Sequence, residues 1–172
     1  MLYRTGVIIG GFQPLHIGHE DLINTALNLC DYLYIYIGQR KNGSENVFSF
    51  NTRKELILTV FKNYTNRIKI FKNEYRSKEL WCNYILQLFK ETIGHNPNII
   101  IHGDEDVRRQ WFPQIQRNFN ELFIPRRSPV DGYRINGTNV RKALLNNNKQ
   151  LFNMCMNPKL HNQFERLKAE IY

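Results

Sequence analysis

The chain has 172 residues and a net charge of +9, with 24 basic residues against 15 acidic ones. Apolar residues make up 42% and charged residues 23%, which are the proportions of a globular protein with its own core. No apolar run reaches the roughly 18 residues of a membrane span, and the first residues lack the apolar region of a signal peptide. We therefore expect a cytoplasmic protein with no membrane partner, whose positive charge attracts a phosphate-bearing ligand.

Short apolar runs rich in β-branched or aromatic residues have the composition of buried strands. They cover residues 6–10, 32–38, 68–71, 98–101 and 122–124. Longer segments with apolar residues at helical spacing lie between them, and alternating strands and helices predict a parallel sheet covered on both faces. We therefore expect an α/β fold, a Rossmann-like parallel sheet of about five strands with helices on both faces and a helical C-terminal tail.

The helical stripes fall at residues 22–30, 56–61, 81–94, 107–115 and 157–171. Thr52 and Glu55 have the spacing of a capping box at the start of the second helix, and Gly94 is a suitable stop for the third. The polar residues 146–149 form a short link. We expect one domain over residues 1–145 and C-terminal helices over 146–172 that pack on it, although their last apolar stripe also suits a neighbouring subunit of a homo-oligomer.

The cysteines and carboxylates do not predict a metal site. Cys30, Cys82 and Cys155 lie far apart and form no C-x-x-C pair, which favours free thiols over a disulfide framework or a zinc site. The acidic residues form no cluster that would hold a cation. We therefore expect the chain itself to bind no metal ion.

The stretch GGFQPLHIGH, residues 10–19, follows the first predicted strand and opens the first predicted helix. Ligands of open α/β sheets bind beyond the carboxyl ends of the strands, which is where this loop lies. Gly10 allows the backbone to approach a ligand closely, and Gly18 lets the chain enter the helix tightly. The helix amides and dipole favour an anion there, and His16 and His19 would stabilise charge that develops on a phosphate.

A second stretch, INGTNVRKAL at residues 135–144, has the pattern of a helix that begins at an anion site. Thr138 can cap the helix and meet an anion, and Arg141 lies one turn further on. An ordinary cap with a solvent-facing arginine is the alternative for this stretch alone. Its combination with the first stretch favours a phosphate site.

The two stretches together resemble the nucleotidyltransferase superfamily, whose H-x-G-H motif and I-S-x-T-x-x-R element bind the phosphates of a nucleoside triphosphate. The resemblance implies catalytic roles for His16, His19 and Arg141. It also implies ATP contacts, which fall on Gly10, Phe12, Gln13, Gly18, Thr138 and Arg141. Class I aminoacyl-tRNA synthetases share the first motif, but they also need a K-M-S-K-S-like loop and a much longer chain.

Within that superfamily, G-x-F-Q-P-x-H-x-G-H is similar to the archaeal type of nicotinamide-nucleotide adenylyltransferase, which has bacterial and phage relatives. VFSFNTRKELI, residues 47–57, resembles the segment whose arginine grips the mononucleotide phosphate, and this position is Arg53 here. The resemblance also implies that Trp81 stacks on the nicotinamide ring. In HGDEDVRRQWFP, residues 102–113, it implies a substrate contact for Asp106 and a phosphate contact for Arg108 or, by preference, Arg109.

The resemblance thus implies an adenylyltransferase that joins ATP and nicotinamide mononucleotide into NAD and releases pyrophosphate, with Mg²⁺ carried by the ATP phosphates. The family usually has an arginine where Gly11 stands, so this chain departs from the pattern there. One alternative is another acceptor, such as nicotinate mononucleotide, phosphopantetheine or flavin mononucleotide. Another is a non-catalytic nucleotide- or nucleic-acid-binding module, against which the intact His16, His19 and Arg141 argue.

Overall fold

The computed structural model describes residues 1–39, 47–74, 78–103, 119–125 and 135–171, and for residues 78–82 it describes the backbone alone. Asp106, Arg109 and the helix expected at 107–115 lie outside these residues. The strands are β1 (Tyr3–Gly10), β2 (Cys30–Gln39), β3 (Ile68–Glu74), β4 (Ile99–His102) and β5 (Asn120–Phe123). The helices are α1 (Ile17–Leu29), α2 (Phe50–Val60), α3 (Lys78–Ile93), α5 (Gly137–Leu145), α6 (Lys149–Cys155) and α7 (Phe164–Ile171), with 3₁₀ helices η2 (Lys62–Tyr64) and η3 (Pro158–Gln163).

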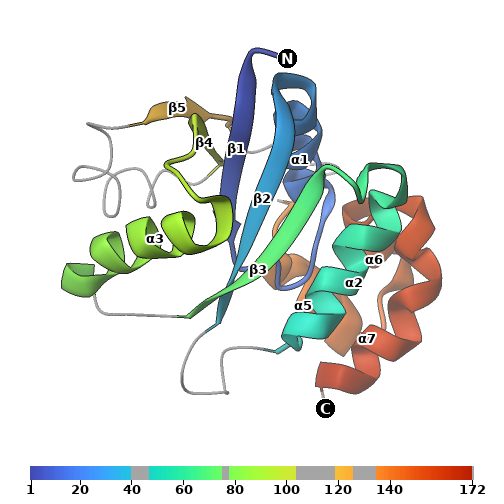
Figure 1. Cartoon of the computed structure of the whole chain (residues 1–172). Helices are drawn as coiled ribbons and strands as arrows, with labels where there is room; N and C mark the ends of the chain where they lie inside the picture. Colours follow the sequence, from blue (N-terminus) through green and yellow to red (C-terminus); the bar gives the residue numbers. More distant parts are fainter. Residues whose placement is uncertain (40–46, 75–77, 104–118, 126–134, 172) are drawn as a thin grey trace.

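The five strands form one sheet in the order β3-β2-β1-β4-β5, and every neighbouring pair is parallel. Their carboxyl ends therefore share one edge of the sheet, where β1 and β4 lie side by side. The strand order changes direction at this point. Strands β2 and β3 lie on one side of β1, whereas β4 and β5 lie on its other side (Figure 1). Such a switch point is where open α/β sheets bind their ligands.

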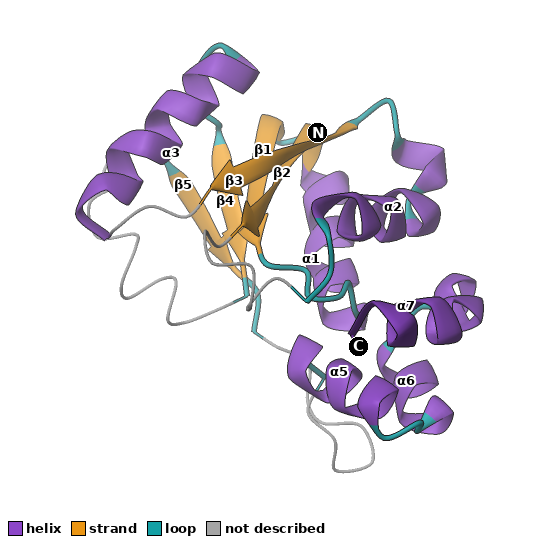
Figure 2. Cartoon of the chain, turned by 90° about the horizontal axis from the view of Figure 1, so that it is seen from below, coloured by secondary structure: helices purple, strands orange, loops and turns teal. Residues whose placement is uncertain are grey.

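Helices cover both faces of the sheet, as Figure 2 shows. Helix α3 lies against one face, where Ile85 and Phe89 pack on Val7, Tyr36 and Ile100. Helices α1, α2 and α5–α7 lie on the other side, and their buried residues form the larger core cluster. The expected Rossmann-like architecture with helices on both faces is confirmed.

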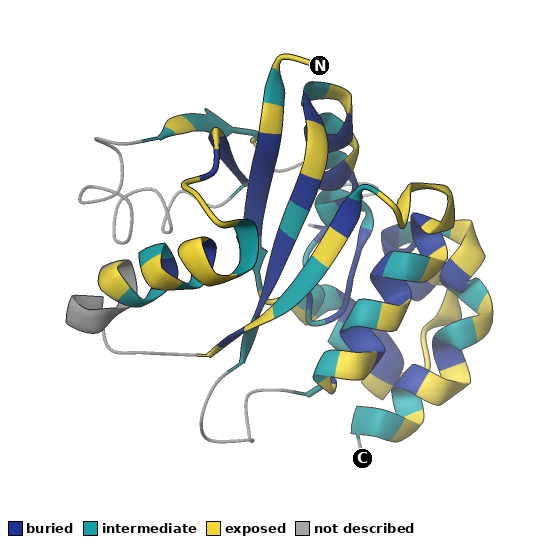
Figure 3. Cartoon of the chain, viewed as in Figure 1, coloured by how far each residue is buried: buried dark blue, intermediate teal, exposed yellow. Residues whose placement is uncertain are grey.

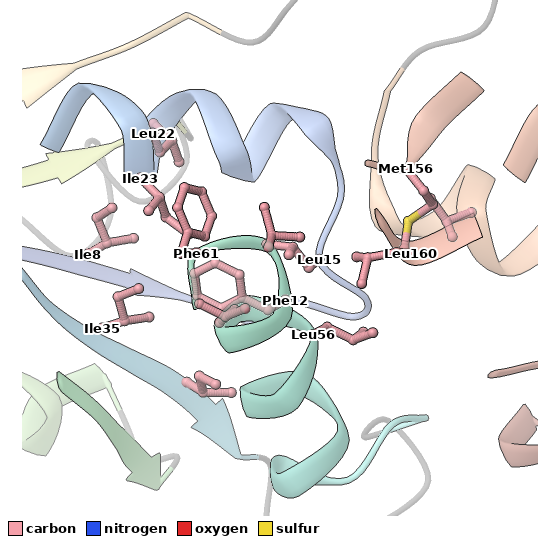
Figure 4. Packing of buried hydrophobic residues seen from close by; sticks show 14 of the residues in the cluster. Ile8, Phe12, Leu15, Leu22, Ile23, Ile35, Leu56, Phe61, Met156 and Leu160 are labelled. Carbon is pink, nitrogen blue, oxygen red and sulfur yellow. The ribbon is translucent and has the colours of Figure 1, made fainter. Parts of the chain in front are cut away.

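The larger cluster extends from the sheet through α1 and α2 to the C-terminal helices (Figure 4). Leu160, Phe164 and Leu167 are buried in it, and Ile171 packs against it, so the last apolar stripe faces this domain. The burial pattern in Figure 3 follows the same division, with buried positions turned toward the sheet and exposed ones toward solvent. The boundary between residues 145 and 146 stays a prediction.

Two expected helix caps are wrong by a few residues. Helix α2 begins after Ser49, whose Oγ accepts a hydrogen bond from the Thr52 amide at 3.0 Å, so Ser49 is the cap and Thr52 lies inside the helix. Helix α5 begins after Asn136, whose side chain accepts from the Asn139 amide at 2.8 Å, so Thr138 is not the cap. In both helices the cap is the residue just before the first helical residue, because its short side-chain acceptor reaches the amide three residues further on.

Other boundaries differ as well. Cys30 ends the predicted α1 stripe but begins β2, and it is buried there with a free thiol. The polar link at 146–149 is a tight corner that starts α6, a helix absent from the sequence prediction: Asn147 has a left-handed φ of 53° and Asn148 caps α6. The segment after Asn157 begins as η3 before α7 continues it. The expected stop at Gly94 is confirmed by its φ of 83°.

Within the described residues, no helix is both long and apolar enough to cross a membrane. The same residues contain no group of three or more histidine, cysteine, aspartate or glutamate side chains placed to hold a metal ion.

The shared core predicts that the C-terminal helices stabilise the whole domain. Leu160→Ala removes a side chain that is 0% exposed, and we expect it to lower the free energy of unfolding by about 2–5 kcal/mol in chemical denaturation. Leu145→Ala is the matched control, because Leu145 is 45% exposed, and its loss should stay within about 0.5 kcal/mol. Equal losses in the two variants would contradict the shared core.

Candidate active site

The loop between β1 and α1 carries two imidazoles stacked on each other. The His16 and His19 rings have centroids 3.8 Å apart, and the Phe12 ring lies 4.6 Å from His19. His16 is the residue at the N-cap position of α1, and its carbonyl accepts the His19 amide at 2.8 Å. A side chain at Gly18 would bring its Cβ within 3.1 Å of the His16 ring, so glycine leaves room for the imidazole above the first helical turn.

This loop and the first turn of α5 enclose one cavity of about 430 Å³ at the carboxyl edge of the sheet. The cavity lining comes from the end of β1 and the loop after it, from α1, from the ends of β4 and β5, and from the start of α5. The lining residues are Ile8–Gln13, His16, Gly18, His19, Leu22, His102, Gly103, Ile124, Ile135–Thr138 and Arg141. The six residues expected to contact ATP, and the two histidines expected to be catalytic, lie on this lining. The two sequence motifs, more than 115 residues apart, are therefore brought together.

Direct contacts join the two motifs. Arg141 donates from Nη1 to the Gln13 carbonyl at 2.6 Å and from Nη2 to the Thr138 hydroxyl at 3.2 Å. A Cβ at Gly137 would lie only 2.5 Å from the same Gln13 carbonyl oxygen, a distance that no real side chain tolerates. The glycine thus lets the N-terminus of α5 touch the loop. Partial burial lowers the pKa of Arg141.

The electrostatics of the cavity favour an anion. The first turns of α1 and α5 both border it, and unpaired amides at helix N-termini attract phosphate oxygens. Arg141 adds a guanidinium, and the Thr138 hydroxyl beside it can donate or accept a hydrogen bond. Two imidazoles, a guanidinium and two helix N-termini can bind the phosphates of a nucleoside triphosphate.

Arg53 lies behind the loop and does not line the cavity. Its guanidinium is 0% exposed and donates to the carbonyls of Gly11 at 2.7 Å, Gly38 at 2.9 Å and Ser49 at 3.2 Å. Burial lowers the pKa of Arg53 to about 10. Its Nη2 has no hydrogen-bond partner within the part of the chain that the structure describes.

Gln13 adds a second contact between the loop and the start of α2. Its Oε1 accepts the Phe48 amide at 2.9 Å, so the segment at 47–53 is bonded to the loop at two points, Gln13 and Gly11. Trp81 belongs to the backbone of α3, and its side chain is outside the description. The contacts expected for Asp106 and Arg109 lie outside the described residues.

One residue of the cavity wall, His102, was not expected from the sequence. His102 ends β4 and is 3% exposed, and its Nε2 lies 2.5 Å from Oε1 of Glu121 on β5. The signal was present, because a histidine closes the otherwise apolar run NIII at the ligand-binding edge of the predicted sheet. Only the pairing of β4 with β5 shows that a carboxylate stands beside it.

The close approach at Gly137 predicts a large effect of one methyl group. Gly137→Ala should push α5 away from the loop, lower the free energy of unfolding by about 1–3 kcal/mol and weaken ATP binding measured by calorimetry. Gly38→Ala is the control, because the nearest atom to its added Cβ is 3.8 Å away. Unchanged ATP affinity in Gly137→Ala would show that the contact does not shape the site.

The chain is similar to known proteins both in sequence family and in fold. The family model for cytidylyltransferase-like proteins matches residues 7–143, and these include both motifs. A phosphopantetheine adenylyltransferase of Francisella philomiragia is 31% identical over 71 residues, which are 41% of this chain and 43% of the relative. One of Dichelobacter nodosus is 28% identical over 116 residues, covering 63% of this chain and 64% of the relative. The matches thus span less than two thirds of these curated relatives.

Solved structures share the fold at low sequence identity. A bifunctional NMN adenylyltransferase/ADP ribose pyrophosphatase from Francisella tularensis superimposes with a TM-score of 0.76 at 21% identity, over 97% of this chain and 50% of that one. The same protein complexed with AMP and a manganese ion gives 0.74 at 22% identity, over 98% and 52%. A Vibrio parahaemolyticus protein described as a nicotinate-nucleotide adenylyltransferase gives 0.64 at 12% identity, over 94% and 99%. Because the family model matches residues 7–143, which is more than half of the chain, the chain belongs to the cytidylyltransferase-like family.

Proposed function

We propose that this chain is an adenylyltransferase that transfers the AMP part of ATP to the phosphate of nicotinamide mononucleotide. The observation that carries the proposal is the convergence of the stacked His16 and His19 with Thr138 and Arg141 on one cavity. The Francisella tularensis structure is named as an NMN adenylyltransferase, and the superposition covers 97% of this chain. This likeness supports the choice of acceptor.

In the proposed reaction, a phosphate oxygen of the mononucleotide attacks the α-phosphorus of ATP in line. A new P–O bond forms, the bond from the α-phosphorus to the bridging oxygen breaks, and pyrophosphate leaves with that bonding pair. His16 and His19 donate hydrogen bonds to the α-phosphate as its charge grows, while Thr138 and Arg141 hold the departing pyrophosphate. Positioning and charge stabilisation supply the rate, without covalent work by the protein.

The nucleotide enters as its magnesium complex, so Mg²⁺ belongs to the substrate. Magnesium keeps several waters and binds through few protein ligands, so the ATP phosphates can carry it. The AMP and manganese complex of the Francisella tularensis protein supports a divalent ion in this site. Among the ATP contacts we place the amides around Gly10 and Gly18 and the side chains of Phe12 and Gln13.

The acceptor side carries the remaining sequence assignments. We propose that Trp81 stacks on the acceptor base and that Asp106 and Arg109 contact the acceptor. The sequence assigns Arg53 to the acceptor phosphate, but its guanidinium is 0% exposed and does not line the cavity. We propose instead that Arg53 positions the loop after β1 through its carbonyl contacts.

Other acceptors of the same class are the second candidate. Phosphopantetheine is favoured by the names of the relatives that match in sequence, and nicotinate mononucleotide by the Vibrio parahaemolyticus structure. Gln13 argues for the mononucleotides, because phosphopantetheine enzymes usually carry aspartate at this position. An aspartate is one methylene shorter than Gln13, whose Oε1 reaches the Phe48 amide at 2.9 Å.

Pyrophosphate release tests the proposal. The protein is mixed with Mg-ATP and, in separate reactions, nicotinamide mononucleotide, nicotinate mononucleotide, phosphopantetheine or flavin mononucleotide. We expect release with nicotinamide mononucleotide and a fall of kcat by about 10²–10³-fold in His19→Ala, since one transition-state donor is lost. His95→Ala, at an exposed histidine after α3, is the control and should keep the wild-type rate.

Release with a different acceptor would retain the mechanism and change the substrate. ATP binding without release in any reaction would refute the enzyme and favour a nucleotide-binding module. If such a module bound nucleic acid instead, its affinity for a polynucleotide would fall steeply with salt.

A further inference from the structure

The proposed mechanism gives no role to a polar bridge that joins the last helix, α7, to the first turn of α2. Thr52 of α2 is 5% exposed, and its hydroxyl lies 3.0 Å from both carboxylate oxygens of Glu170 on α7. The two residues are 118 positions apart in the sequence, and Figure 1 shows the end of α7 beside the start of α2. A buried hydroxyl that donates to a carboxylate makes a strong, directional contact, so the bridge fixes the start of α2.

The hydrogen bonds of this bridge have a definite direction. A carboxylate only accepts, so Thr52 donates its single hydroxyl hydrogen to Glu170. The Ser49 and Thr52 hydroxyl oxygens lie 2.9 Å apart, and Ser49 is therefore the donor to Thr52. The Ser49 oxygen keeps a lone pair for the Thr52 amide, which it accepts at 3.0 Å as the cap of α2. Glu170 thus orders the helix cap as well as Thr52.

A second contact between the same helices lies beside the bridge. Arg166, one turn before Glu170 on α7, donates to the two carboxylate oxygens of Glu55 on α2 at 2.5 Å and 2.7 Å. Its Nε lies 3.8 Å from Glu170. The side chains of Arg166 and Glu55 are 44% and 53% exposed, so this ion pair is a surface contact that adds little stability. The buried Thr52 hydroxyl makes the stronger constraint on the first turn of α2.

The first turn of α2 is also where the loop after β1 is attached. Arg53 follows Thr52, and its Nε donates to the Ser49 carbonyl at 3.2 Å. Its Nη1 donates to the Gly11 carbonyl at 2.7 Å. Gly11 lies on the cavity lining, between two residues expected to contact ATP. A continuous series of hydrogen bonds therefore runs from Glu170 on α7 to the wall of the cavity.

We propose that Glu170 and Thr52 are positioning residues for the ATP site, which act through Ser49 and Arg53 on the loop after β1. Glu170 and Thr52 do not line the cavity, so they contribute by holding the loop in the geometry that receives the triphosphate. A small displacement of the loop is costly, because both binding and transfer depend on the alignment of its groups. This inference rests on the proposed function and adds the C-terminal helix to the parts that shape its ATP site.

Removal of either side of the bridge tests the proposal. Glu170→Ala deletes the acceptor, and Thr52→Val deletes the hydroxyl at nearly unchanged volume. We expect each variant to raise the calorimetric Kd of Mg-ATP about five- to tenfold and to lower kcat by a similar factor, since the loop carries residues for both steps. The double variant should bind Mg-ATP as weakly as either single variant and no more weakly, because both substitutions remove one shared contact.

Conservative substitutions separate positioning from packing. Thr52→Ser keeps the hydroxyl but loses a buried methyl group, whereas Thr52→Val keeps the volume and loses the hydroxyl. Positioning predicts a Kd of Mg-ATP within about twofold of wild type for Thr52→Ser and a weakened one for Thr52→Val, because the bond to the carboxylate depends on the hydroxyl. Packing alone predicts the reverse order, because Thr52→Ser leaves a cavity. Glu170→Gln keeps an acceptor oxygen and should lie between wild type and Glu170→Ala.

Matched controls come from the same C-terminal segment. Glu165→Ala removes another carboxylate of α7, whose contact is the exposed Lys149 at 2.8 Å, and it should change neither Kd nor kcat. Leu160→Ala lowers the stability of the domain and should retain the wild-type Kd of Mg-ATP while the protein is folded. Chemical denaturation of each variant gives the folded fraction. Glu170→Ala carries the test if Thr52→Val fails to fold, because the Glu170 side chain is 28% exposed.

The outcomes distinguish this inference from the function on which it rests. An unchanged Kd of Mg-ATP in folded Glu170→Ala, a larger effect of Thr52→Ser than of Thr52→Val, or additive losses in the double variant would overturn the inference. A wild-type protein that binds Mg-ATP but releases no pyrophosphate with any acceptor would refute the proposed function, and the Kd comparison would still decide the inference. A wild-type protein that binds no Mg-ATP would refute both. Weaker binding in Glu170→Ala and Thr52→Val with recovery in Thr52→Ser would establish the bridge as part of the site.

Discussion

The site depends on how the loop after β1 is held. Its Gln13 carbonyl accepts Arg141 from α5, its Gly11 carbonyl accepts Arg53 from α2, and the Gln13 side chain accepts the Phe48 amide. Between these anchors Phe12 adopts a left-handed φ of 49°, which is uncommon for a bulky side chain and persists only where the surroundings fix it. That conformation brings the Phe12 ring against His19, which in turn stacks on His16.

The anchors also explain why a cation as costly to bury as Arg53 is retained. The guanidinium loses hydration on burial, and this desolvation lowers the pKa of Arg53. The carbonyl oxygens of Gly11, just after β1, and of Gly38, near the end of β2, accept its hydrogen bonds and offset part of that cost. The positive charge behind the loop then adds to the anion-attracting field of the two helix N-termini.

Local patterns sufficed for the architecture and for the two phosphate motifs, because strands of β-branched residues and glycine-rich strand–helix turns are written in contiguous sequence. Local patterns indicated the wrong residue where two nearby residues could each cap a helix. Ser49 rather than Thr52, and Asn136 rather than Thr138, cap their helices, and only the backbone geometry decides between them. The partnership of His102 with Glu121 depends on strand pairing across 19 residues, which no local pattern encodes.

The two faces of the sheet carry unequal constraints. The side with α1, α2 and α5 holds the loop through direct hydrogen bonds and a contact that only glycine at 137 permits, so its geometry tolerates little change. The α3 side is held by apolar packing, with Ile85 and Phe89 against Val7 and Ile100. The two motifs therefore depend on the first face, where the hydrogen bond between Arg141 and the loop keeps both of them on one cavity.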